Sequence, residues 1–70
     1  MTRIRKGDKF VSTKKLAGLI INEIYRTSDN EVAFIDYTLG DEEGAVSYLD
    51  DPRLVAHIIS NNGFHKVAVE

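Results

Sequence analysis

The chain has 70 residues, of which 43% are hydrophobic, 29% are charged and none is cysteine. This length allows one small domain, and the globular composition excludes a chain that is disordered throughout. No apolar run approaches the roughly 18 residues of a membrane span, and the opening MTRIRK does not have the apolar centre of a signal peptide. The missing cysteines exclude a disulfide scaffold and a thiolate zinc site. We therefore expect a single cytoplasmic domain over residues 1–70, without membrane contact.

The net charge of −2 hides a strong asymmetry along the chain. Residues 1–15 carry six cations against one carboxylate, whereas residues 16–70 carry three cations against ten carboxylates. Such a polarity indicates either a charged partner or two solvated surfaces that neutralise each other across the fold. Both interpretations stay open at the level of the sequence.

Five segments have the alternation or the composition of β-strands. These segments are residues 8–12, 19–27, 32–39, 45–49 and 64–69. The second and third are rich in strand formers, and residues 28–31 (SDNE) between them supply turn chemistry, which predicts a hairpin.

A helical pattern interrupts the strands at residues 52–61. Its apolar positions fall on one helical face and are Leu54, Val55, Ile58 and Ile59. Asp51 followed by Pro52 predicts an N-cap and a first helical residue, and residues 61–63 (NNG) predict a left-handed stop.

The resulting order, β-β-β-β-α-β, predicts a mainly β (α+β) protein with a five-stranded antiparallel sheet. The sheet is expected to form either an SH3-like small barrel or a curled sheet with one packed helix. The opening KGDKF resembles the first strand of SH3-like folds of the KOW and Tudor type, in which a Gly-Asp pair turns the chain into the barrel. The ending FHKV at residues 64–67 and the compact length resemble small phage or prophage proteins of this shape. The resemblance implies a phage-type modulator or inhibitor of a host protein.

The central hairpin carries apolar residues on both predicted faces. Strict alternation places Leu19, Ile21 and Tyr25 on one face of the second strand, and Ile20 and Ile24 on the other. One ten-residue helix covers only part of a sheet, so the second side is covered either by the helix or by a partner. A second copy of the chain is one such partner, because a core of this size is marginal. Residues 1–7 are expected to form a flexible basic lead-in.

Aromatic and acidic residues are the candidates for a protein-partner surface. Three consecutive strands carry one tyrosine each, namely Tyr25, Tyr37 and Tyr48. They form an aromatic patch if they share a face, although ordinary β-propensity also explains them. A loop between glycines carries Asp41, Glu42 and Glu43. This loop is either a solvated tip or a negative surface for a basic partner, such as a nucleic-acid-binding protein whose DNA it imitates.

The alternative function is nucleic-acid binding through the N-terminal cations. The residues that would contact phosphate are Arg3, Arg5, Lys6, Lys9, Lys14 and Lys15. An overall pI near 5.6 argues against this alternative.

Catalysis is the function that the sequence supports least, and we expect no cofactor and no metal. The two histidines, His57 and His65, have no metal-ligand spacing, and N-capping explains Asp51 without a catalytic role. We therefore expect a non-enzymatic binding protein whose partner is another protein or a second copy.

Overall fold

The computed structural model describes residues 4–14, 17–41 and 43–67. Within these residues the chain forms five strands and one helix in the predicted order. The elements are β1 (Lys9–Ser12), β2 (Gly18–Arg26), β3 (Val32–Gly40), β4 (Val46–Asp50), α1 (Pro52–Asn61) and β5 (Phe64–Val67). The sequence pattern placed these bounds to within one residue, except that the predicted end of the last strand, residue 69, lies outside the described residues.

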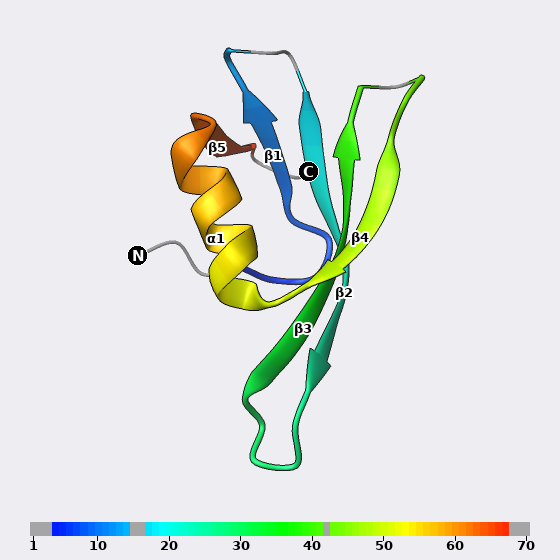
Figure 1. Cartoon of the computed structure of the whole chain (residues 1–70), viewed down its shortest axis with the longest axis vertical. Helices are drawn as coiled ribbons and strands as arrows, with labels where there is room; N and C mark the ends of the chain where they lie inside the picture. Colours follow the sequence, from blue (N-terminus) through cyan, green and yellow to red (C-terminus); the bar gives the residue numbers. More distant parts are fainter. Residues whose placement is uncertain (1–3, 15–16, 42, 68–70) are drawn as a thin grey trace.

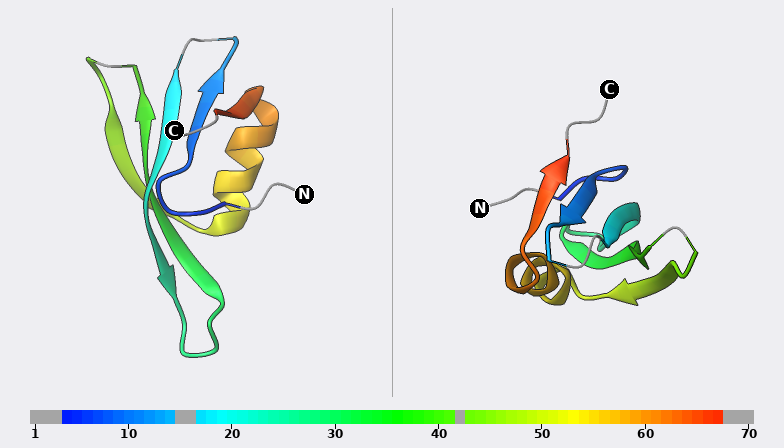
Figure 2. Two further views of the ribbon diagram at one scale, coloured as in Figure 1. Left: turned by 180° about the vertical axis from the view of Figure 1, so that it is seen from behind. Right: turned by 90° about the horizontal axis from the view of Figure 1, so that it is seen from above.

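The strands form one antiparallel sheet in the order β4-β3-β2-β1-β5 (Figure 1). The last strand returns to lie beside the first, so β1 occupies the space between β2 and β5. Seen from above, the sheet curls towards the side that carries the helix (Figure 2). Among the described residues, the edge strands β4 and β5 do not pair with each other, so the sheet is open. The mainly β class is confirmed, and the sheet is curled rather than closed into a barrel.

Two irregularities bend the central hairpin. In β2, Ile21 pairs with Tyr37 and Glu23 pairs with Asp36, so Asn22 is an extra residue. A second shift follows between Tyr25 and Arg26. Each extra residue interrupts the ladder and increases the local twist, and the far end of the hairpin projects beyond the rest of the molecule (Figure 1).

The extra residue in β2 overturns the predicted face of Tyr25. Strict alternation grouped Tyr25 with Leu19 and Ile21, whereas the register pairs Tyr25 with Phe34 on the opposite face. Ile24, paired with Ile35, takes its place on the helix side. An insertion of one residue exchanges the two faces for every residue beyond it, because side chains alternate with a period of two.

The core lies between the sheet and α1. Its buried apolar members are Phe10, Leu19, Ile21, Ile35, Tyr37, Val55 and Ile59. Of the four residues predicted for the packed helix face, Val55 and Ile59 are buried and Ile58 packs against the core. Leu54 was predicted to belong to the packed face of the helix. Its side chain is 46% exposed, so this prediction was wrong. The helix contacts chiefly β3 and β5, which leaves Leu54 on the outer margin of its apolar face.

Both ends of α1 have the predicted chemistry. The Asp51 carboxylate accepts a 2.7 Å hydrogen bond from the backbone N–H of Arg53, and Pro52 is the first helical residue. Gly63, with φ of 65°, follows the C-cap residue Asn62. The buried hydroxyl of Ser12 donates a 2.6 Å hydrogen bond to the carbonyl of Asn62, which ties the end of α1 to β1.

The chain enters β1 through a turn at Gly7 and Asp8. The Asp8 backbone N–H bonds the Arg5 carbonyl at 3.1 Å, and the largely buried Asp8 carboxylate accepts from the Arg5 N–H at 2.9 Å. Ile4 packs against the core. The predicted lead-in over residues 1–7 thus lies partly outside the described residues, and its remainder forms this turn.

Candidate protein-binding surface

The three tyrosines do not gather on one face. Tyr37 and Tyr48 pair across β3 and β4 on the helix side, with ring centroids 5.5 Å apart and planes at 28°. Tyr25 lies on the opposite face, where it is 50% exposed. The aromatic residues therefore divide into a stacked pair and a separate exposed ring.

Tyr37 is a core residue. Its side chain is 2% exposed, and its hydroxyl donates a 2.6 Å hydrogen bond to Asp50. Burial raises the pKa of the Tyr37 phenol well above its usual range, and the hydrogen bond to Asp50 raises it further. These contacts assign Tyr37 to stability, and they leave Tyr48 as the accessible ring of the pair.

The acidic loop is a compact turn between β3 and β4. One carboxylate oxygen of Asp41 accepts from the backbone N–H groups of Glu43 at 3.2 Å and of Gly44 at 2.6 Å. Both Asp41 and Glu43 are exposed, and Glu42 lies outside the described residues. The turn therefore presents at least two carboxylates to solvent at one end of the sheet.

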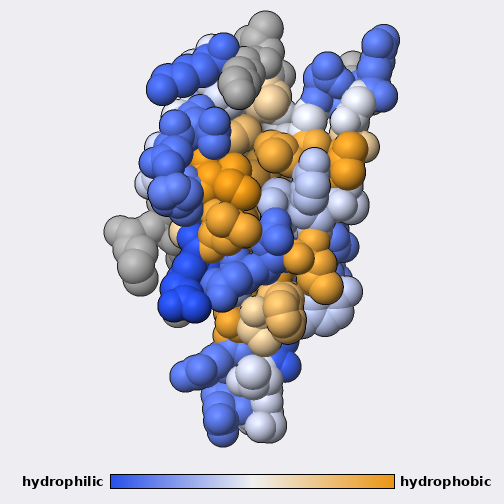
Figure 3. All heavy atoms as spheres, in the orientation of Figure 1, coloured by the Kyte–Doolittle hydropathy of each residue, from blue (hydrophilic) through white to orange (hydrophobic). Residues whose placement is uncertain are grey.

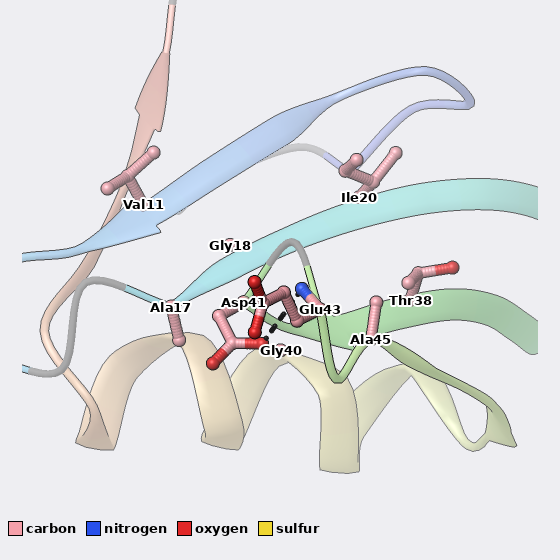
Figure 4. Close-up of a pocket in the computed structure, with 9 residues that line it drawn as sticks. All are labelled: Val11, Ala17, Gly18, Ile20, Thr38, Gly40, Asp41, Glu43 and Ala45. Atoms are coloured by element: carbon pink, nitrogen blue, oxygen red, sulfur yellow. Dashed lines mark hydrogen bonds between the residues drawn. The ribbon is translucent and has the colours of Figure 1, made fainter.

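A groove of about 610 Å³ adjoins this turn on the face that α1 leaves uncovered (Figure 4). Val11 from β1 and Ile20 from β2 supply apolar surface, and Thr38 lines the groove from β3. Asp41 and Glu43 also line it, and the backbone N–H of Glu43 donates a hydrogen bond to the Asp41 carboxylate (Figure 4). The groove thus combines an aliphatic surface with a local negative charge.

The uncovered face carries Ile20, which the alternation of the second strand predicted for the second face of the hairpin, together with apolar residues from the other strands. Val11, Ile20, Phe34 and Leu49 are large apolar residues whose side chains are exposed there. Phe34 precedes the buried residue Ile35 in β3 and therefore lies on the face opposite the core. Phe34 is 50% exposed because α1 covers only the other side of the sheet.

The described N-terminal cations lie around β1. Lys9 pairs with Ile20, a residue of the groove, and Lys14 follows β1 at the end of the sheet where Gly18 pairs with Gly40, the residue before the acidic turn. Lys6 forms a 3.0 Å ion pair with Glu23, which holds the pKa of that carboxyl below its usual range. Arg5, Lys9 and Lys14 are exposed, and the structure gives them no ion pair among the described residues. Arg3 and Lys15 lie outside the described residues.

Charge is consequently segregated across the sheet. At the two ends of β4 the described carboxylates are Asp41, Glu43, Asp50 and Asp51, and the described cation there is Arg53, bound to Asp51 at 3.2 Å. Around β1 and β5 the described cations are Arg5, Lys6, Lys9, Lys14 and Lys66, and the described carboxylate there is Asp8, 3.5 Å from Lys66. Because β4 and β5 are opposite edges, the asymmetry of the sequence becomes an acidic side and a basic side of one molecule.

The two histidines take no part in the groove. His57 lies on the exposed flank of α1, 2.7 Å from the Asn61 side chain, and His65 lies in β5 opposite Val11. In the described part of the chain, no helix is long and apolar enough to cross a membrane.

No family model, curated protein or solved structure matches the chain.

Proposed function

We propose that this chain is a non-enzymatic binding protein that acts through a protein–protein interface, and that its partner presents a basic surface. The observation that carries the proposal is the groove, in which aliphatic residues lie beside the Asp41 and Glu43 carboxylates. A lysine or arginine side chain has matching chemistry, because its apolar stem packs on aliphatic surface while its charged end stays near carboxylates.

The groove supports a protein partner better than a small substrate. It lies open on the uncovered face of the sheet, and exposed apolar side chains continue beyond it at Phe34 and Leu49. Exposed apolar surface bordered by charge is typical of protein interaction sites. Association at such a site is expected to be fast and sensitive to salt.

The SH3-like resemblance and the phage-type role are part of this proposal. The strand order, with β1 between β2 and β5, is consistent with an SH3-like module whose barrel has not closed. In a phage-type modulator or inhibitor acting in the cytoplasm, the acidic side of the sheet would occupy a basic functional surface of a host protein.

Nucleic-acid binding is the second candidate, and a specific observation favours it. Arg5, Lys9 and Lys14 are exposed near β1 on the basic side of the molecule. Phosphate contacts by these residues would give affinity that falls steeply with salt.

Site-specific photocrosslinking tests the two candidates in an extract of the source cells. A benzophenone amino acid at Ala45, in the groove, is expected to crosslink a protein partner, whereas the same probe at Ser60, on the exposed side of α1, is not. The double variant Asp41→Lys, Glu43→Lys should abolish the Ala45 crosslink. The matched double variant Lys9→Glu, Lys14→Glu should leave it intact.

A crosslink that survives charge reversal at Asp41 and Glu43 would contradict the proposal. So would tight binding to random-sequence DNA or RNA that is lost in the Lys9→Glu, Lys14→Glu variant. That result would show that the protein binds nucleic acid through the cations of its basic side.

A further inference from the structure

The outer edge of β4 is the less protected edge of the sheet. β4 pairs with β3 through a regular ladder from Ile35–Asp50 to Leu39–Val46, without a bulge. Its sequence VSYLD contains no lysine, arginine or proline. In an edge strand, alternate residues direct unpaired backbone N–H and C=O groups outward, where another strand could pair with them. Proteins usually protect such an edge with charged residues or proline, with bulges, or by keeping the strand short. The other edge, β5, contains Lys66.

The exposed edge carries apolar side chains on both faces. Val46 and Tyr48 project to the helix side, and Leu49, which is 58% exposed, projects to the opposite side. On the helix side, apolar residues gather in the strip between α1 and β4 (Figure 3). An added strand at this edge would therefore find apolar contacts for alternate side chains on each of its faces.

Carboxylates lie at both ends of β4. Asp41 and Glu43 precede the strand in the acidic turn, and Asp50 and Asp51 stand where it ends. Arg53 pairs with Asp51, so one cation faces four carboxylates in this region of the described chain. The edge thus favours a strand with an apolar centre and basic ends.

We propose that the β4 edge binds an extended segment of the basic partner as an added strand. The inference rests on the proposed function for the charge of the partner, and it adds the mode of binding. In strand addition, backbone hydrogen bonds supply affinity, and the pockets for alternate side chains supply specificity. Here Val46 and Tyr48 contact apolar side chains of the segment, while its flanking lysines or arginines lie near the carboxylates.

The same charges argue against a second copy as the occupant. Antiparallel pairing of two β4 edges about Tyr48 would bring the acidic turn of one copy beside Asp50 and Asp51 of the other. Like charges placed together disfavour association. A basic segment would instead place its cations beside the carboxylates at both ends of β4.

An NMR titration of the full chain with two synthetic peptides tests the proposal. The probe is the extended peptide KRVTVTVRK, and its matched control is EEVTVTVEE, which has the same centre and acidic ends. The basic peptide is expected to slow hydrogen exchange of alternate backbone amides in β4, and the acidic peptide is not. Binding should weaken as salt is raised.

Variants locate the binding on the edge rather than in the groove. Leu49→Lys adds a charge to β4 and should weaken binding of the basic peptide by about tenfold or more. Ile20→Lys adds the same charge to the groove and reports on binding there. Ser60→Lys adds it to the exposed side of α1, and this control should change binding of the basic peptide little. Ser47→Lys is a second edge variant, and because Ser47 and Leu49 are exposed, both variants are expected to fold.

Three results would overturn the proposal. The first is a lack of binding at millimolar peptide, and the second is binding that leaves the β4 amides unprotected. The third is protection of β4 that rises with protein concentration in the absence of peptide, which would make a second copy the occupant. Sensitivity to Ile20→Lys but not to Leu49→Lys would reject the edge while leaving the groove and the proposed function standing.

Discussion

The Tyr37 hydroxyl donates a 2.6 Å hydrogen bond to the Asp50 carboxylate, which joins the core of β3 to the last residue of β4. Asp50 directly precedes Asp51, the N-cap of α1. The bond therefore helps to set the place where the chain leaves the sheet and enters the helix. It also shows why a tyrosine that looks like a binding residue in the sequence serves the fold.

Replacing Tyr37 by phenylalanine should destabilise the fold. The substitution removes the hydroxyl and its hydrogen bond to a carboxylate, at an expected cost of about 1–2 kcal/mol in the free energy of unfolding. Tyr48→Phe is the matched control, because Tyr48 is exposed and its hydroxyl makes no hydrogen bond among the described residues. Urea denaturation at neutral pH measures both. Equal effects of the two variants would show that the Asp50 bond contributes nothing.

Tyr37 should also make stability fall at alkaline pH. Its pKa is raised in the folded chain, so the folded state holds the phenolic proton more tightly than the unfolded state does. The resulting stabilisation is complete below about pH 10, the ordinary tyrosine pKa, and is lost as pH rises above it. The free energy of unfolding should therefore fall more steeply from pH 9 to 11 in the wild type than in Tyr37→Phe. Parallel profiles would contradict this expectation.

Asp51 should stabilise α1 both as a cap and as a charge. Asp51→Ala removes the acceptor for the Arg53 N–H and should lower the melting temperature, whereas Asp51→Asn keeps an acceptor and should lower it less. Hydrogen bonds from Arg53 hold the pKa of Asp51 below its usual value, so its charge-dependent contribution is present above about pH 4 and is lost on acidification. Thermal melts from pH 7 to pH 2.5 should therefore converge for the wild type and Asp51→Asn. A constant difference would assign no role to the charge.

Three glycine-to-alanine substitutions should differ in how much they lower the free energy of unfolding, according to the φ angle of each glycine and the space around it. Gly40 has φ of 141°, and an added Cβ would lie 2.9 Å from the Gly44 carbonyl oxygen. Gly40→Ala should therefore cause the largest loss in the free energy of unfolding. Gly63 has φ of 65°, and an added Cβ would meet only the Lys14 side chain at ordinary contact distances from 3.8 Å, so Gly63→Ala should lower the free energy of unfolding by about 1–2 kcal/mol from backbone strain. Gly18 has neither restriction, and its alanine variant should be neutral or slightly stabilising. Chemical denaturation gives the order, and a different ranking would contradict the backbone geometry of these turns.

Two leucines distinguish the core from the proposed edge. Leu19 is completely buried, and Leu19→Ala should cost about 2–5 kcal/mol. Leu49 is exposed, and Leu49→Ala should change stability by no more than about 0.5 kcal/mol. A large loss at Leu49 would mean that the β4 edge serves the fold rather than a partner.

The sequence by itself determined the elements and their order. The helix bounds follow from local chemistry, because Asp51, Pro52 and Gly63 act on backbone groups within one turn. The strands follow from the alternation and composition of residues close together in the chain. The sequence also contained the charge asymmetry, although it left open whether the two charged segments neutralise each other.

Only the tertiary structure decided how these elements present a surface. The extra residue Asn22 moves Tyr25 to the face opposite Tyr37, and alternation cannot reveal it because a bulge depends on the partner strand. The helix covers one face and leaves Leu49 exposed on the other, which depends on packing between segments distant in sequence. The strand order separates β4, with carboxylates at both ends, from β1 and its cations, so the two segments neutralise each other only at ion pairs such as Lys6–Glu23. Faces, edges and grooves arise from long-range pairing, and a single sequence records such pairing only indirectly.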